Sequence, residues 1–235
     1  MASTISGPGI LYVNSKIART DLINEESYMK WYSEDHIPEI IETSAINSAL
    51  RWKDVDPKAN KPFLVMYPMK DIAFTQGEEF KKIRVHSDLL PNQGPIYDLA
   101  DIDVRYYGLI QTYDPKGAKP EQDFDDWYRK EHLEMIAPTR GYLRTTRYKL
   151  LYYRTNAQSR ELKGLPPRPE DKEVQAPPTW LAIHEFDTED LDTKALMATA
   201  DTEWSKGILG SIARMEALTY HHVASYGDGK FFHGQ

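Results

Sequence analysis

An internal repeat with a period of 96 residues is the strongest constraint on what this chain can fold into. At that offset, seven of the 23 positions from 31 to 53 carry the same residue in both copies. A fixed period of self-similarity indicates duplicated structural units, so we expect two diverged copies of one unit of roughly a hundred residues. The identical pairs are Trp31 and Trp127, Tyr32 and Tyr128, His36 and His132, Ile40 and Ile136, Thr43 and Thr139, Arg51 and Arg147, and Lys53 and Lys149.

The pattern of apolar residues predicts the same order of elements in both copies. Short apolar runs bounded by turn residues indicate strands, and longer runs with a helical period indicate helices. Asn24 is the predicted N-cap of the first helix, because its side chain can accept from free backbone N–H groups of the first turn. The predicted strands are 10–14, 48–53, 62–69, 99–107, 107–113, 143–153, 179–186 and 214–226, and the predicted helices are 24–35, 75–86, 120–136 and 193–208.

Each copy therefore has the order β-α-β-β-α-β, which is the split βαβ or ferredoxin-like arrangement. The predicted fold class is α+β, with the first repeat at 1–105 and the second at 106–235. Little chain remains for a linker, so we expect the repeats to be joined rigidly. The second repeat carries an insertion at 154–178, rich in proline and charge. We expect this insertion to be irregular and to act as a lid over the second copy's pocket.

The composition excludes several classes of function. The chain has 36 acidic and 29 basic residues and a net charge of -7, which argues against a nucleic-acid partner. It contains no cysteine, so thiolate catalysis and disulfides are excluded. The sequence has no metal-binding spacing and no phosphate-binding loop, so we expect neither a metal nor another cofactor. No apolar run is long enough to span a bilayer and no signal peptide is present, so we expect a cytoplasmic protein without a membrane partner.

The motif Trp-Tyr-Ser-Glu-Asp-His-Ile-Pro at 31–38 closes the first helix of a ferredoxin-like half, and it resembles the EthD-like members of the dimeric α+β barrel superfamily. The second copy, Trp-Tyr-Arg-Lys-Glu-His-Leu at 127–133, is similar but lacks the proline. The resemblance implies two units packed sheet against sheet into a barrel, here within one chain. A monomer then suffices for the barrel, and a homodimer can still form through outer surfaces. The superfamily includes monooxygenases, polyketide cyclases, decarboxylases and isomerases, so the resemblance does not decide the reaction.

The repeated motif carries the predicted chemistry. On an α-helix His36 lies four residues after Tyr32 and shares its face, and His132 and Tyr128 repeat this pair. An imidazole beside a phenol can serve in general acid–base catalysis, so these four are the predicted catalytic residues. The alternative is structural: each histidine caps the C-terminal end of its helix, where the helix dipole favours a positive charge.

Further residues are candidates for substrate binding. The residues that we expect to line a pocket are Trp31, Trp127, Tyr28, Phe124, His184 and His222. The tryptophans can equally be core residues between helix and sheet. Arg51 and Arg147 can pair with a substrate carboxylate or phenolate, although a bridge to Asp35 or Glu131 explains them as well.

We therefore expect a cofactor-independent enzyme that performs acid–base chemistry on a small hydrophobic aromatic or polyketide-like metabolite. Cyclisation, isomerisation, dehydration and decarboxylation are the reactions considered. The alternatives are a cofactor-independent monooxygenase of the same fold and a non-catalytic small-molecule-binding protein. We also expect the two copies to be functionally unequal. The second copy is favoured as the active one, because the insertion, His184 and His222 all lie in the second half of the chain.

Overall fold

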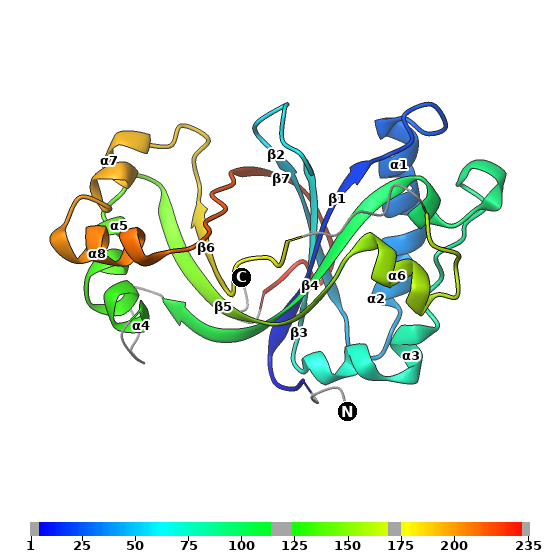
Figure 1. Cartoon of the computed structure of the whole chain (residues 1–235), viewed down its shortest axis with the longest axis horizontal. Coiled ribbons are helices and arrows are strands. Elements are labelled where there is room, and N and C mark those ends of the chain that lie inside the picture. The colour runs from blue at the N-terminus through cyan, green and yellow to red at the C-terminus, as the bar shows by residue number, and fades with distance from the viewer. Residues whose placement is uncertain (1–4, 114–123, 169–174, 232–235) are drawn as a thin grey trace. The chain divides into compact units, whose positions relative to one another are not determined.

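The computed structural model describes residues 5–113, 124–168 and 175–231, and it is a mixed α+β fold with antiparallel strands (Figure 1). The chain divides into two compact units. Unit 1 comprises Met1–Gly108, Leu150–Pro177 and Leu218–Gln235, and unit 2 comprises Leu109–Lys149 and Pro178–Ala217. Unit 1 thus takes in two segments from the C-terminal half of the chain. The assignment of 1–105 and 106–235 as two sequence repeats stays a prediction.

Unit 1 is built on a sheet with helices along it. Strands β4 (Ala100–Tyr113), β1, β3 and β2 are neighbours in that order, which is the strand order of a split βαβ unit. Every residue of β3 is buried, as expected of a central strand. The elements of this unit are β1 (Gly9–Ile17), α1 (Glu25–Trp31), a π-helical turn (Tyr32–His36), α2 (Ile37–Ile41), β2 (Ser48–Asp54), β3 (Phe63–Met69), a 3-10 helix (Ile72–Gln76), α3 (Glu78–Lys81), 3-10 turns at Pro91–Gln93 and Ile96–Asp98, α6 (Asn156–Leu162) and β7 (Tyr220–Gly227).

The start of the predicted first helix is confirmed, including its N-cap. Asn24 lies in an extended conformation, and its side chain accepts a hydrogen bond of 2.9 Å from the backbone N–H of Ser27. The predicted second helix at 75–86 is largely wrong. Its place is taken by the 3-10 helix and the single turn α3, which are separated by the extended residue Gly77. Glycine is a poor helix former, because fixing its backbone costs more entropy than for any other residue.

Two predicted strands join into one. β4 (Ala100–Tyr113) spans both the predicted 99–107 and 107–113 strands, so it passes from unit 1 into unit 2 without a break. β5 (Tyr142–Arg154) likewise belongs to both units, and its C-terminal end in unit 1 lies beside β4. β7 pairs with β2 at the edge of unit 1. The predicted fourth strand of the second repeat therefore has its partner in the first.

The insertion at 154–178 is not irregular throughout, which corrects our expectation. Thr155 begins α6 with a capping box, in which its side chain and that of Gln158 each bond the other's backbone N–H. This arrangement satisfies two helix N–H groups that otherwise lack partners. The insertion up to residue 177 belongs to unit 1 and not to the unit that carries the second motif. Its role as a lid stays a prediction. Residues 169–174 lie outside the described residues.

Unit 2 combines the end of β4, the first part of β5 and a further strand, β6, with short helices on one side of them (Figure 1). The first part of β5 pairs antiparallel with β6, from Tyr142 opposite Phe186 to Lys149 opposite Trp180. The predicted helix at 193–208 is broken in two, because Thr202 caps a new helix by accepting from the N–H of Ser205. The further elements of unit 2 are α4 (Phe124–Trp127), a π-helical turn (Tyr128–His132), α5 (Leu133–Ile136), β6 (Trp180–Phe186), α7 (Thr193–Ala198) and α8 (Glu203–Ser211).

None of the helices in the described part of the chain has the length and apolar composition that crossing a bilayer requires.

Candidate active site

The motif shared by both copies forms a π-helical turn, where we expected an uninterrupted α-helix. In unit 1 the backbone N–H of Ile37 donates to the carbonyl of Tyr32, five residues earlier. In unit 2 the N–H of Leu133 donates to the carbonyl of Tyr128 in the same way. The turn does not depend on the proline that follows His36, since the second copy lacks it. Single π turns within α-helices are rare and occur frequently at functional sites.

The wider turn changes which side chains meet. The ring of His36 stacks on Trp31, five residues earlier, with centroids 4.5 Å apart and planes at 16°. His132 stacks on Trp127 with nearly the same geometry, 4.4 Å and 19°. Tyr32 meets His36 only by a ring edge at 5.8 Å. Among the described residues, no hydrogen bond joins the Tyr32 hydroxyl to the imidazole. Aromatic packing on Trp31, and not a hydrogen bond from the Tyr32 hydroxyl, therefore orients His36.

His36 and Trp31 line a cavity of about 520 Å³ whose walls all belong to unit 1. The motif helices form one wall and the sheet forms another. Leu11 on β1, and Ile102 and Val104 on β4, face the cavity because alternate residues of a strand lie on the same side. The volume falls within the range of known small-molecule pockets. The lining is mainly aliphatic and aromatic, which suits a compact apolar molecule.

Burial of the side chain keeps His36 neutral near pH 7. Burial lowers the pKa of His36 to about 4; the carboxylate of Asp35 opposes this effect, and the charges of Lys163 and Arg84 add to it. Asp35 itself forms an ion pair with Arg84 at 2.8 Å. A neutral imidazole has one nitrogen that can accept a proton and one that can donate a hydrogen bond. At pH 7 His36 can therefore act as a proton acceptor inside the cavity.

Tyr28, a predicted substrate-binding residue, lies in the core and does not line this cavity. Its hydroxyl donates to the Ser15 hydroxyl at 3.0 Å, and its ring stacks on Trp31 at 5.9 Å. Burial also raises the pKa of Tyr28 and of Tyr32, so both phenols are protonated near pH 7. Tyr28 supports the position of Trp31, and through it that of His36.

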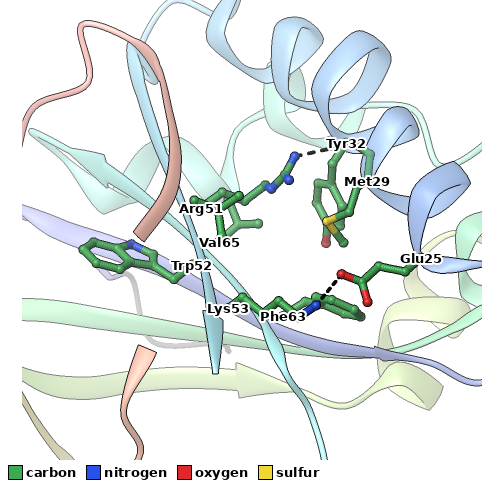
Figure 2. Close-up of a pocket in the computed structure, with 9 residues that line it drawn as sticks. Glu25, Met29, Tyr32, Arg51, Trp52, Lys53, Phe63 and Val65 are labelled. Atoms are coloured by element: carbon green, nitrogen blue, oxygen red, sulfur yellow. Dashed lines mark hydrogen bonds and ion pairs between the residues drawn. The ribbon is translucent and has the colours of Figure 1, made fainter. Parts of the chain in front are cut away.

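A second, much smaller cavity of about 60 Å³ is also lined by Tyr32. Figure 2 shows the side chain of Arg51 reaching from β2 toward the helix that carries Met29 and Tyr32. Arg51 donates to the Ser33 hydroxyl at 2.6 Å and to the Tyr226 hydroxyl at 3.0 Å. Its guanidinium is thus already bonded within the protein, although not to Asp35 as the structural alternative proposed. The cavity is too small for a metabolite, and the guanidinium beside it already has hydrogen-bond partners within the protein.

In unit 2, His132 forms a largely buried pair with His184. The two ring centroids lie 6.1 Å apart, and the Thr145 hydroxyl is 2.7 Å from Nδ1 of His184. Burial lowers the pKa of His132 to about 4 and that of His184 to about 3, so both rings are neutral near pH 7. Nδ1 of His132 is buried without a hydrogen-bond partner among the described residues. The structure thus brings together two of the histidines that the sequence singled out.

The remaining unit 2 candidates are held by specific partners. Trp127 donates from Nε1 to the Ser205 hydroxyl at 3.0 Å, which anchors the second copy of the motif to α8. The guanidinium of Arg147 lies 4.3 Å from the ring centroid of Tyr128 and forms a buried ion pair with Asp125. The expected bridge from Arg147 to Glu131 is therefore wrong. The side chain of Phe124 lies outside the described residues.

His222, a predicted substrate-binding residue of the second copy, belongs to unit 1 and not to the unit that carries the second motif. It is exposed on β7, with Nε2 2.9 Å from the Ser225 hydroxyl and its ring edge-on to Trp52 at 4.9 Å. The cause is the pairing of β7 with β2, which places His222 in unit 1. It does not line the larger cavity either.

The structure adds two residues to the site that we did not consider. Arg154 at the end of β5 and Lys163 just after α6 both line the larger cavity. Both lie in the insertion, more than a hundred residues after the motif. The alternation of Tyr152 and Arg154 along a strand was a usable indication that they share a face. Within the described ranges, no three His, Asp or Glu side chains gather as a metal-binding group.

No protein-family model matches this chain. Over 114 residues it is 28% identical to "Core atranone cluster (CAC) protein 1" of Stachybotrys chlorohalonatus (strain IBT 40285), a match that covers 48% of each chain. The match thus spans about half the length of this relative. A crystal structure of an anthrone oxidase-like protein is similar over 94% of both chains, with a TM-score of 0.49 and 14% identity.

Proposed function

We propose that the larger cavity of unit 1 is an active site in which His36 transfers a proton on a small aromatic or polyketide-like molecule. One observation carries this proposal. A neutral imidazole, fixed by stacking on Trp31, lines an apolar cavity of about 520 Å³. The name of the Stachybotrys relative assigns that protein to the core atranone cluster, which agrees with a role in small-molecule metabolism for the present chain.

The chemistry follows from the charges around His36. The imidazole nitrogen removes a proton from a carbon acid or phenol, which leaves an enolate or phenolate and an imidazolium. Lys163 and Arg84 disfavour the imidazolium in the empty cavity, but they stabilise the anion that forms on the substrate. Return of the proton to another atom gives isomerisation, and its delivery to a leaving hydroxyl gives dehydration. The proposal includes the tandem EthD-like arrangement, with the first copy as the active one.

A hydrogen–deuterium exchange experiment tests this proposal even when the product of the reaction has not been identified. Molecules that copurify with the protein are identified by mass spectrometry and then incubated with it in D₂O. The wild type should exchange a substrate proton for deuterium, and His36→Asn should slow the exchange roughly a hundred-fold or more. His86→Asn is a matched control, because His86 is exposed and lies outside the cavity lining. Unchanged exchange in His36→Asn would contradict the proposed role.

Two other outcomes identify the alternatives. Oxygen uptake during turnover, measured with an electrode, would instead indicate the cofactor-independent monooxygenase. Binding without deuterium exchange by the wild type would indicate a small-molecule-binding protein. One observation favours this second alternative: within the described chain, no hydrogen-bonding partner orients the His36 ring, whereas general bases are commonly oriented by one.

A further inference from the structure

The lining of the larger cavity is positively charged although the whole chain is acidic. The chain carries a net charge of -7. Among the described residues that line the cavity there is no Asp or Glu, yet four of them are cations: Lys81, Arg84, Arg154 and Lys163. Charges in a poorly solvated cavity interact more strongly than charges in water. The cavity thus presents a positive potential to whatever enters it.

Two of the four cations already have carboxylate partners. Lys81 pairs with Glu78 at 2.5 Å, and Arg84 pairs with Asp35 at 2.8 Å and with Glu39 at 3.1 Å. The side chains of both cations are more than half exposed to solvent. Their charges are therefore compensated by the protein and by water.

Among the described residues, Arg154 has no carboxylate partner of this kind. It is only 7% exposed, and its guanidinium lies 5.5 Å from the ring centroid of Tyr106. Its Nε is buried without a hydrogen-bond partner, and no carboxylate of the described chain lies within salt-bridge distance. A buried charge without a counter-ion is costly. The capping box that begins at Thr155 fixes the backbone directly after Arg154.

Lys163 lies nearby with spare donor capacity. Its ammonium group donates to the carbonyl oxygens of Lys81 and Ile83, both at 2.8 Å. An ammonium has three N–H donors, so these bonds leave one donor. Burial, and after it the charge of Arg154, lowers the pKa of Lys163. Both cations line the same cavity, so an anion inside it can interact with both charges.

We propose that Arg154 and Lys163 bind the carboxylate of an aromatic acid whose ring system occupies the apolar part of the cavity. A guanidinium matches a carboxylate with two parallel hydrogen bonds, and the ammonium supplies a third. Tyr97, Tyr106 and Trp31 offer aromatic surface to the rings. This inference deepens the proposed function by naming its substrate class, and it rests on that function for the choice of cavity only.

Binding of two ligands of the same shape tests the inference. The probes are 2-naphthoate and its uncharged counterpart 2-naphthamide, titrated into the full chain by calorimetry. The wild type should bind the acid roughly ten-fold or more tightly than the amide, as hydrogen bonds to charged groups contribute. Arg154→Met should abolish this preference, and Lys163→Met should reduce it. Lys81→Met is the matched control, because its ammonium is already paired with Glu78, and it should keep the preference.

The outcomes separate this inference from the proposed function. Arg154 is buried, so circular dichroism and the thermal midpoint must show that Arg154→Met is folded; if it is not, the half-buried Lys163 carries the test. Equal binding of both probes by the wild type, no binding of either, or an unchanged preference in the folded variants would overturn the inference. His36→Asn should retain the preference for the acid. If His36→Asn loses proton exchange but still prefers the acid to the amide, the result bears on the catalytic role of His36 and not on the binding of the carboxylate.

Discussion

Acidification should destabilise the protein through His36, and the structure gives the direction and the size of the effect. The pKa of this residue is about 4 in the folded chain, against an ordinary value of 6.5. Because the folded pKa is the lower one, the unfolded chain binds the proton more tightly. The stability that neutral His36 contributes is therefore complete above pH 6.5 and is lost as the pH falls toward 4.

The magnitude follows from the two pKa values. With these folded and unfolded pKa values of His36, lowering the pH from about 7.5 to about 5 removes roughly 2 kcal/mol of unfolding free energy. Below the folded pKa the loss approaches its limit of roughly 3 kcal/mol. This is a large share of the total stability of an ordinary domain, which is about 5–15 kcal/mol.

Urea denaturation, followed by tryptophan fluorescence, measures the effect. The wild type is compared with His36→Gln at about pH 7.5 and about pH 5, because glutamine does not titrate. Carboxylates elsewhere titrate alike in both proteins, so they cancel in the difference. His36→Gln should lose roughly 2 kcal/mol less than the wild type over this range. Equal losses would show that His36 is not held neutral by burial, and the electrostatic basis of the candidate site would fall with it.

Three further predictions concern stability and are checked by urea denaturation at neutral pH. Asn24→Ala should cost about 1 kcal/mol through loss of the N-cap, and Asn24→Ser should restore most of it. Asp125→Ala should cost about 3–5 kcal/mol by leaving buried Arg147 unpaired, whereas Asp126→Ala, which removes a partly exposed pair, should cost less than about 1 kcal/mol. Gly227→Ala should cost more than about 1 kcal/mol, because φ is +64° and the new Cβ would lie 2.2 Å from a backbone oxygen; no measurable loss would contradict that steric argument.

Local features of the fold were predictable because they depend on residues close together in the chain. The Asn24 cap needs only an amide side chain three residues before a free N–H, and the structure has this bond. The strands at 48–53, 62–69 and 179–186 were predicted within a residue or two, since an apolar run bounded by turn residues is itself the evidence. The recurrence of the Trp-Tyr-x-x-x-His motif was visible from the alignment of the chain with itself.

The shape of that motif was not predictable in the same way. A π-helical turn differs from an α-helix by one backbone hydrogen bond, and the side-chain pattern of the motif does not reveal it. Helical periodicity therefore paired His36 with Tyr32, four residues earlier, while the wider turn pairs it with Trp31. The consequence is chemical, since a stacked indole fixes the imidazole ring without taking up either nitrogen.

The sequence by itself determined that this chain carries two related helix-ending motifs, that each motif holds a histidine, and where several of the strands beside them lie. Only the tertiary structure decided which partners those elements have. An apolar strand pattern identifies a strand but not its neighbour, so the pairing of β7 with β2, which puts His222 in unit 1, could not be read from it. The positions of Arg154 and Lys163 in the lining of the His36 cavity likewise depend on tertiary contacts. Contacts between residues far apart in the chain are set by how the whole hydrophobic surface is buried, and no local pattern records that.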